Sequence, residues 1–373
     1  MLSISDFVAF ISILTCLGLS TTLVVRGIQG KHHHRKKRNQ RLVDSILKPF
    51  SRTLTDREKD PSRPREAPVP IPSYKRFNWK TFLRATGVRL SRREVGLFYQ
   101  LRQKVWNINE DEYVKCFKQD KLEGGGNLGF SGAAFFFTPN GKRFIVKSLP
   151  NEFEWKFFYD DLLVSYFSYM SENRDSLLCR ITDALFNLDL RFWNWIRLGT
   201  ASNFLVMQNN LPDFNEDKGC KSYDLKPQDY LRADLMVPMS SEQEETMLFH
   251  KKGIKLSRQN YDNLITVLTR DCKFLSDKKV VDYSLLLGIY PIECVDKLEQ
   301  PQNFFSGVIS SDGKFVYRIS IIDYFFSHKT APTIIANVAD VIPGDQEFTF
   351  TDKPSSYRQK FLDMVKEYID VTD

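Results

Sequence analysis

The sequence predicts an α+β fold in two lobes, preceded by an N-terminal apolar segment. Three observations predict it: an uncharged stretch of 19 residues from Phe7 to Val25, a strand pair followed by a long helical stretch before residue 211, and short strands mixed with helices after it. A strand-rich part followed by a mixed part, without regular β–α repeats, is typical of α+β domains.

The stretch from Phe7 to Val25 is long enough to cross a bilayer. As a helix with a rise of about 1.5 Å per residue it extends ~28 Å, close to the ~30 Å thickness of the hydrocarbon core. A cleaved signal peptide needs positive charge ahead of the apolar run, but only Asp6 lies there. Because the basic cluster Lys31–Arg41 follows instead, we expect residues 1–30 to be a transmembrane anchor with the rest of the chain cytosolic. A peripheral hairpin and a misassigned start are the alternatives.

Basic residues are concentrated in the first part of the chain. Residues 1–104 carry 22 Lys and Arg against 7 Asp and Glu, and residues 105–373 carry 31 against 39, so a net charge of +7 divides into +15 and −8. This asymmetry predicts an anionic partner for the first part. Beside a membrane span we expect Lys31–Arg41 to contact an anionic membrane surface, at about 1 kcal/mol per basic residue, and we expect no nucleic acid. A stop-transfer flank without lipid specificity is the alternative.

Residues 31–75 are predicted to form a basic, proline-rich linker. Six prolines fall between positions 44 and 75. Each removes a backbone donor and fixes φ, so we expect no regular element over 44–75. Apolar patterning returns near Arg76, and residues 76–373 are expected to form one domain, with an N-lobe over about 76–210 and a C-lobe over about 211–373.

The strand pair is the clearest local structure. The Asn-Gly turn signal in Pro139-Asn140-Gly141 joins two predicted strands. Apolar residues at helical spacing then predict a helix over Glu152–Met170. The remaining expected elements are strands over Asn203–Gln208, Tyr283–Ile289 and Phe315–Ile322, and a helix over Ser257–Leu275 with Ser257 as its N-cap.

Cysteine and histidine usage excludes some classes of enzyme. Six cysteines are scattered without a Cys-x-x-Cys pair, which indicates reduced thiols rather than a metal or disulfide site. Only His250 and His328 lie beyond the N-terminal basic cluster. The chain therefore offers few histidines for a zinc hydrolase site or for a histidine-dependent catalytic triad.

Glycines before the strand pair and a lysine on its second strand suggest a phosphate site. Ser131 and Gly132 lie in the segment Gly129–Gly132, and Lys147 follows two apolar residues. Glycine lets a backbone approach phosphate closely. A glycine-containing hairpin followed by a strand lysine is how protein kinases hold the phosphates of ATP. A plain turn and a lysine that reaches solvent are the alternatives.

Three aspartates occupy positions suited to phosphoryl transfer. Asp224 and Lys226 are two residues apart, so on a strand they share a face and could grip phosphate and metal. Asp282 opens a very apolar run and would suit accepting or orienting the proton of an attacking hydroxyl. Asp323 ends an apolar strand, the usual place of a Mg²⁺ ligand in a phosphotransferase. Alone, each aspartate could equally pair with a neighbour, cap a helix or close a turn.

The order of these motifs along the chain is more specific than any one of them. Together they resemble the phosphatidylinositol phosphate kinase family, in particular its phosphatidylinositol 4-phosphate 5-kinases, over roughly residues 90–373. The motifs are Gly-x-Ser-Gly (129–132), Ile-Val-Lys (145–147), Tyr-Asp-Leu-Lys (223–226), Asp-Tyr-Ser-Leu-Leu-x-Gly (282–288) and Ile-Ile-Asp (321–323), with similar segments at 270–275 and 357–362.

The resemblance implies a two-lobed, SAICAR synthase-like fold and a lipid kinase domain over residues 76–373. It also implies Mg²⁺-dependent transfer of the γ-phosphoryl group of ATP to a phosphatidylinositol phosphate, with phosphatidylinositol 4-phosphate as the expected lipid and the 4,5-bisphosphate as product. By motif match, Lys147 and Lys226 would hold ATP phosphates, and Asp282 would act at the acceptor hydroxyl. The other implied assignments are Asp323 as the Mg²⁺ ligand, Ser131 and Gly132 in the phosphate-covering loop, and Met207 and Asn209 near the adenine.

Two departures from the family pattern keep other functions open. Pro227-Gln228 stands where the family usually has Gly-Ser, and the segment Tyr324–Asp352 lacks the usual paired lysines. A catalytically weak scaffold that binds phosphoinositide or nucleotide at a membrane is therefore an alternative, as is a kinase for soluble inositol phosphates. Family members often dimerise, so a homodimer is also an expectation, without an interface signature in the sequence.

Overall fold

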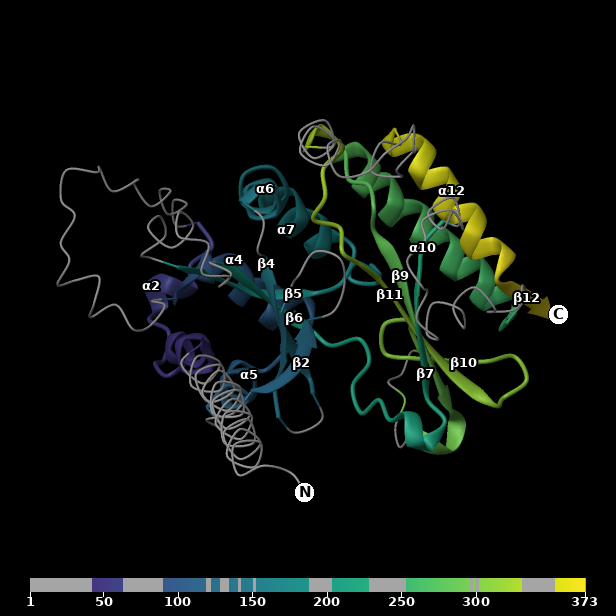
Figure 1. The fold of residues 1–373 in the computed structure, drawn as a ribbon, viewed down its shortest axis with the longest axis horizontal. Coiled ribbons are helices and arrows are strands. Elements are labelled where there is room, and N and C mark those ends of the chain that lie inside the picture. Colours follow the sequence, from purple (N-terminus) through teal and green to yellow (C-terminus); the bar gives the residue numbers. More distant parts are fainter. Residues whose placement is uncertain are drawn as a thin grey trace, which may run out of the picture.

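The computed structural model describes residues 42–62, 90–118, 122–127, 134–139, 142–149, 152–187, 203–227, 253–295, 298, 302–330 and 353–372. Its strands form one six-stranded sheet, one four-stranded sheet and a two-stranded pair, and helices accompany both larger sheets (Figure 1). This mixed content confirms the predicted α+β class.

The six-stranded sheet is antiparallel, with the order β1-β5-β6-β4-β3-β2. The predicted strand pair is present as β3 and β4, with Phe136 opposite Val146. The central strands are apolar because side chains on both of their faces are buried. The strands are β1 (Leu90–Arg93), β2 (Glu123–Asn127), β3 (Ala134–Phe137), β4 (Phe144–Leu149), β5 (Ile181–Asn187) and β6 (Asn203–Gln208).

The helix predicted over Glu152–Met170 is confirmed, with a π-helical turn inside it. It comprises α6 (Glu152–Lys156), the π-helical turn η4 (Phe157–Leu162) and α7 (Leu163–Glu172). The turn buries the consecutive aromatic residues 157–159. Further helical elements before β2 are α4 (Val95–Gln100), η3 (Leu101–Val105) and α5 (Glu110–Lys115).

The prediction that residues 44–75 lack regular structure is wrong for 44–62. Residues 42–47 are helical, and η1 (Lys48–Phe50) and α2 (Asp56–Lys59) follow. Pro49 fits because it stands in the first turn of η1, where no backbone donor is needed. Phe50 is fully buried and stacks on Phe117 with ring centroids 4.1 Å apart. The segment is therefore part of the first lobe, and residues 63–75 lie outside the described ranges.

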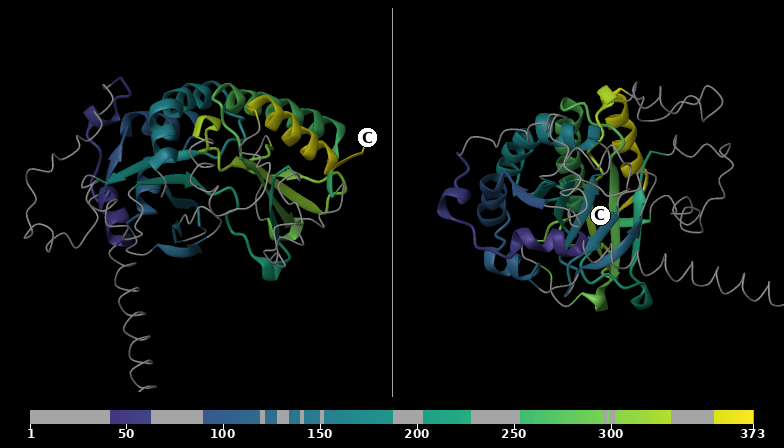
Figure 2. Two further views of the ribbon diagram at one scale, coloured as in Figure 1. Left: turned by 45° about the horizontal axis from the view of Figure 1, so that its top comes forward. Right: turned by 60° about the vertical axis from the view of Figure 1, so that its left-hand side comes forward.

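The four-stranded sheet has the order β10-β11-β9-β7 and carries two long helices. The predicted helix begins after Ser257, whose hydroxyl accepts a hydrogen bond from the Asn260 amide at 3.3 Å, so the predicted N-cap is confirmed. Figures 1 and 2 show α10 and α12 side by side. The elements are β7 (Lys221–Leu225), β9 (Ser284–Pro291), β10 (Val308–Ile309), β11 (Phe315–Ile322), α10 (Arg258–Asp277), α12 (Pro354–Glu367), and the parallel pair β8 (Ile254–Ser257) and β12 (Ile369–Thr372).

The two sheets share one hydrophobic core, and β11 pairs with the segment that precedes β5. The amide of Cys179 donates to the carbonyl of Ile321 at 2.9 Å, and the amide of Ile321 donates to the carbonyl of Leu177 at 2.6 Å. Leu178 and Ile321 thereby form a parallel bridge. The end of β11, where Asp323 follows, is consequently held against the first lobe.

The predicted membrane span from Phe7 to Val25 lies outside the described residues. Among the helices that the structure does describe, none is both long enough and apolar enough to cross a membrane. The anchor remains a prediction from the sequence.

Candidate active site

Lys147 and Asp323 form an ion pair between β4 of the six-stranded sheet and the end of β11 in the four-stranded sheet. Lys147 lies on β4 opposite Phe135 of β3, and its ammonium donates a hydrogen bond to Oδ1 of Asp323. The Lys147 side chain is 8% exposed and the Asp323 side chain 43% exposed. The rings of Phe135 and Phe325 lie 5.5 and 5.6 Å from the ammonium and flank the lysine. An almost enclosed cation is thus directed at a carboxylate that solvent still reaches.

Lys226 and Asp282 form a second ion pair in the same region. Lys226 directly follows β7 and Asp282 precedes β9, and the two strands are antiparallel neighbours. The Lys226 ammonium donates to Oδ1 of Asp282 at 3.1 Å. Both side chains are 29% exposed. A second basic group therefore lies beside the aspartate predicted to act on the acceptor hydroxyl.

Electrostatic coupling joins the two pairs into one site. Desolvation opposes ionisation of Asp323, but the charges of Lys147 and Lys226 outweigh it and hold its pKa below the ordinary value. Desolvation likewise opposes the charged form of Lys226, yet the carboxylates of Asp282 and Asp224 raise its pKa. The four predicted side chains therefore converge, as a phosphotransferase site requires. Their catalytic roles remain predictions.

Asp224, which the sequence pairs with Lys226 as a possible grip on phosphate and metal, is a further member of this site. Desolvation raises its pKa above the ordinary value, although the charges of Lys226 and Lys147 lower it. Its spacing of two from Lys226 was the available signal, but spacing alone could not separate a site residue from an ordinary strand ion pair. Its coupling to both lysines makes Asp224 a candidate site residue.

Both key aspartates have a left-handed backbone. φ is +67° at Asp282 and +60° at Asp323. For a residue other than glycine this conformation costs about 1–2 kcal/mol and persists only where surrounding contacts enforce it. At Asp282 and Asp323 such contacts come from the paired segments around them.

Backbone hydrogen bonds hold the two aspartate segments together. The amide of Val281 donates to the carbonyl of Phe326 at 3.1 Å, and the amide of His328 donates to the carbonyl of Lys279 at 2.8 Å. Between them, Val280 and Ser327 form an antiparallel bridge. The residues just before Asp282 are therefore paired with those just after Asp323, which fixes the spacing of the two carboxylates.

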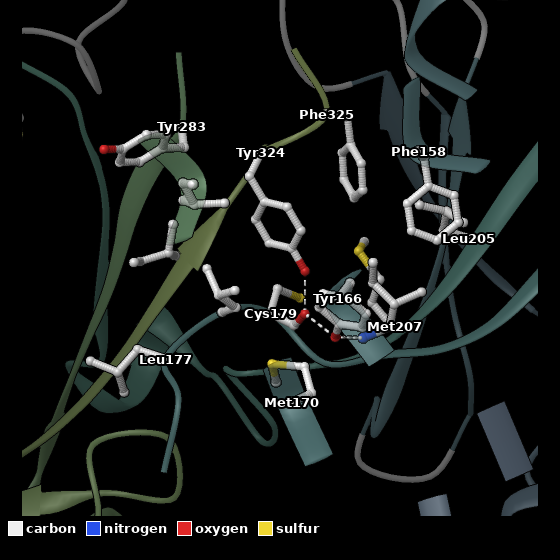
Figure 3. Close-up of a cluster of buried hydrophobic side chains, with 14 of the residues drawn as sticks. Phe158, Tyr166, Met170, Leu177, Cys179, Leu205, Met207, Tyr283, Tyr324 and Phe325 are labelled. Atoms are coloured by element: carbon white, nitrogen blue, oxygen red, sulfur yellow. Dashed lines mark hydrogen bonds between the residues drawn. The ribbon is translucent and has the colours of Figure 1, made fainter. Parts of the chain in front are cut away.

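Aromatic side chains after Asp323 anchor it to the first lobe (Figure 3). The hydroxyls of Tyr324 and Tyr166 both donate to the carbonyl of Cys179. Phe325 makes an edge contact with Phe158 of η4, with ring centroids 5.9 Å apart. The run Tyr324-Phe325-Phe326 was the sequence signal for this anchor, which the sequence analysis did not use.

The predicted adenine-side residues lie at the passage between the sheets. Met207 is buried on β6, and Asn209 follows that strand. The Asn209 amide group donates to the carbonyls of Lys142 and Leu211 at 2.7 and 3.1 Å, and its oxygen accepts from the Leu211 amide. Asn209 thus holds the turn through its side chain, and a role toward nucleotide remains a prediction. Ser131 and Gly132 lie outside the described residues.

The donor set fits a magnesium-bound triphosphate. No three His, Cys, Asp or Glu side chains of the described part of the chain gather into a ready metal cage. Mg²⁺ is commonly bound by one or two carboxylates, substrate phosphates and water. The solvent-accessible carboxylate of Asp323 supplies such a ligand, with Asp224 nearby. The ammonium groups of Lys147 and Lys226 would meet the phosphate charge.

Comparison with protein families shows to which family the chain belongs. The family model described as Phosphatidylinositol-4-phosphate 5-Kinase matches residues 116–304, about half of the chain. The chain belongs to the phosphatidylinositol-4-phosphate 5-kinase family. The matched stretch contains Lys147, Lys226 and Asp282, whereas Asp323 lies beyond it and joins the site through its ion pair with Lys147.

Curated members of this kinase family are about a quarter identical to the chain over the aligned residues. Phosphatidylinositol 4-phosphate 5-kinase type-1 beta of Mus musculus is 27% identical over 286 residues, which are 74% of this chain and 48% of the relative. The Homo sapiens protein of the same name is 26% identical over the same shares. Phosphatidylinositol 4-phosphate 5-kinase of Plasmodium falciparum is 24% identical over 276 residues, 65% of this chain and 15% of the relative. The chain spans about half the length of the mammalian relatives.

Proposed function

We propose that this protein is an ATP- and Mg²⁺-dependent phosphatidylinositol phosphate kinase that converts phosphatidylinositol 4-phosphate into the 4,5-bisphosphate. The observation that carries the proposal is the convergence of Lys147, Lys226, Asp282 and Asp323 in one site. Family membership supports the lipid class, since the named relatives are phosphatidylinositol 4-phosphate 5-kinases.

The proposed roles follow from charge and position. When bound, Mg·ATP supplies the transferable phosphoryl group and part of the charge neutralisation. Lys147 and Lys226 hold phosphate oxygens, and Asp323, with Asp224 beside it, holds the metal. Asp282 orients the acceptor hydroxyl and takes its proton as the new O–P bond forms and the bond to the leaving ADP breaks. Met207 and Asn209 would lie toward the adenine, and by their motif Ser131 and Gly132 would cover the phosphates.

A catalytically weak scaffold is the second candidate, and one observation favours it. Pro227 directly follows Lys226 and is buried. Proline has no N–H to offer a phosphate and its ring blocks close approach of the backbone. A protein that keeps the nucleotide or lipid site but transfers phosphate slowly would tolerate this substitution.

A lipid kinase assay separates these functions. The purified chain is incubated with ATP and Mg²⁺ and a panel of phosphoinositides in vesicles and of soluble inositol phosphates. We expect a bisphosphorylated lipid product that disappears in Asp282→Asn and Asp323→Asn and persists in Asp175→Asn, an exposed aspartate paired with Arg270. Nucleotide binding without product on any lipid would support the scaffold, and product only on soluble inositol phosphates would reassign the substrate.

Attachment to a membrane is proposed for the N-terminal segment. Residues 1–30 would anchor the chain with the kinase domain cytosolic, and the basic cluster Lys31–Arg41 would contact the anionic leaflet. Deleting residues 1–30 should release the protein from sedimented membranes, and retention would shift the attachment to the basic cluster or the kinase domain. A homodimer is a further proposal, which sedimentation of the detergent-solubilised chain would test.

A further inference from the structure

A buried hydroxyl of the C-terminal helix contacts the backbone beside Asp282. Tyr357 on α12 is fully buried, and its Oη donates to the carbonyl oxygen of Tyr283 at 2.6 Å across 74 residues of sequence. The two rings also meet edge to face with centroids 4.8 Å apart. Residues far apart in the chain thus join immediately after the candidate catalytic aspartate.

The Tyr283 carbonyl needs a partner because it lies just outside the sheet. The pairing of β9 with β11 ends at Ser284, and its pairing with β7 ends at Leu285. Tyr283 is fully buried, so solvent does not replace the missing sheet partner. A buried carbonyl left without a hydrogen bond costs about 1–3 kcal/mol. The Tyr357 hydroxyl removes this cost.

The same bond helps to enforce the strained backbone of Asp282. Its φ of +67° requires that both flanks be held. On the N-terminal flank, the Val281 amide donates to the Phe326 carbonyl at 3.1 Å. On the C-terminal flank, the Tyr283 carbonyl accepts from Tyr357. The two hydrogen bonds thus hold the backbone on both sides of Asp282.

The helix presents this hydroxyl from a well-packed position. Phe361 and Val365 of α12 are fully buried, as are Leu264 and Leu268 of α10 beside it. The Phe361 ring contacts the Tyr283 ring with centroids 4.8 Å apart. The packing of α12 therefore fixes the position of the Tyr357 hydroxyl.

We propose that Tyr357 is a positioning residue for phosphoryl transfer: by holding the Tyr283 carbonyl it fixes Asp282, which makes the C-terminal helix a required part of the catalytic centre. The expected effect on rate rests on the proposed function. The expected effect on the Asp282 backbone does not depend on that function. Because Tyr357 is fully buried and acts through the Tyr283 carbonyl, its loss acts on turnover and not on binding.

The test compares Tyr357→Phe with Tyr290→Phe in the full-length chain. Tyr290 lies at the other end of β9 and also donates its hydroxyl to a backbone carbonyl, that of Pro212 at 3.1 Å, so each variant loses one bond of the same kind. Because small misplacement of a reacting group is costly, we expect kcat of Tyr357→Phe to fall about 10-fold with KM for ATP changed less than about 2-fold. Tyr290→Phe should keep kcat near wild type. Equal kcat in the two variants, or parallel losses of kcat and nucleotide affinity in Tyr357→Phe, would overturn the proposal.

Amide hydrogen exchange tests the positioning without any activity. In Tyr357→Phe the peptide that covers residues 279–286 should exchange faster than in wild type, and in Tyr290→Phe it should not. Unchanged exchange in Tyr357→Phe overturns the inference even if the protein proves to have no kinase activity. If exchange is faster in Tyr357→Phe but the wild type has no kinase activity, only the proposed function is rejected. If Tyr357→Phe does not fold, Phe361→Leu retains the hydroxyl but thins the packing that presents it, and the same faster exchange is expected.

Discussion

Oδ1 of Asp282 accepts a hydrogen bond from the ammonium of Lys226 at 3.1 Å, although 56 residues separate them in the chain. The antiparallel pairing of β7 with β9 brings them together, since Leu225 near the end of one strand lies opposite Leu285 near the start of the other. Lys226, which follows β7, and Asp282, which precedes β9, therefore meet at the same end of the sheet. The register of this pair determines the geometry of the site.

Replacing Lys147 by methionine should abolish turnover without unfolding the protein. The variant loses the cation that would hold phosphate, while its partner Asp323 remains partly exposed and can be hydrated. We expect kcat/KM for ATP to fall at least about 100-fold, the scale of losing one well-placed charge-stabilising donor. Lipid product formation measures the rate, and thermal melting confirms the fold. Lys142→Met, an exposed lysine of the same hairpin, is the charge-matched control, and equal activity of the two variants would contradict the assignment.

Replacing Asp282 by glycine should leave the protein more stable than replacing it by alanine. Both changes remove the carboxylate and its bond to Lys226, so both should be inactive. They differ because alanine is strained at a φ of +67° and glycine is not, a difference of about 1 kcal/mol or roughly 2–4 °C in Tm. Differential scanning calorimetry measures it.

The same pair of substitutions at Asp175 provides the control for this backbone effect. Asp175 is exposed, and its φ is not positive. There the alanine variant should match or exceed the glycine variant, because glycine loses more conformational freedom on folding. If the alanine variant also matches or exceeds the glycine variant in stability at Asp282, the backbone of Asp282 is not strained.

Stability should depend on pH through Asp271. This aspartate of α10 is fully buried, and desolvation raises its pKa to about 6 although Tyr169 and the Leu177 amide hydrogen-bond to it. A folded-state pKa above the unfolded value means that its contribution is complete below about pH 4 and is lost as pH rises through about 6, by up to about 3 kcal/mol. Asp271→Asn removes this titration.

Urea unfolding of wild type and Asp271→Asn, from about pH 4.5 to about pH 7.5, measures this dependence. Wild type should lose stability relative to the variant as pH rises and then level off. Asp262→Asn, an exposed change on the same helix, should parallel wild type throughout. A constant difference between wild type and Asp271→Asn across the range would contradict the expected titration.

Residues 42–62 should contribute to the stability of the kinase domain. Phe50 is buried against Phe117 and lies 6.0 Å from the ring of Tyr113, so deletion of residues 1–62 uncovers this aromatic cluster. We expect its Tm to lie at least about 6 °C below that of a chain lacking residues 1–41, given about 3–5 kcal/mol for one buried phenylalanine. Phe50→Ala should reproduce most of the loss, and the exposed change Lys48→Ala should not. Equal melting of the two truncated chains would assign the segment to the linker after all.

Most local elements of the fold were predictable because their signals are local. The Asn-Gly turn, the Ser257 cap and the apolar strands led to β3, β4, α10, β9 and β11 within a few residues of their bounds. The helical segment before residue 62 was missed because six nearby prolines suggested a linker, whereas Pro49 occupies a position that tolerates proline. The π-helical turn at residues 157–162 had no recognisable pattern.

The sequence by itself determined which chemistry the chain carries: lysines and aspartates in a family-specific order, on or beside strands whose apolar patterns are readable without coordinates. Only the tertiary structure decided which carboxylate meets which ammonium, and that Tyr357 contacts the backbone beside Asp282. The reason is physical. Pairs separated by 56 and 176 residues form through strand register and the docking of the two lobes, and those depend on the whole core rather than on any local run of residues.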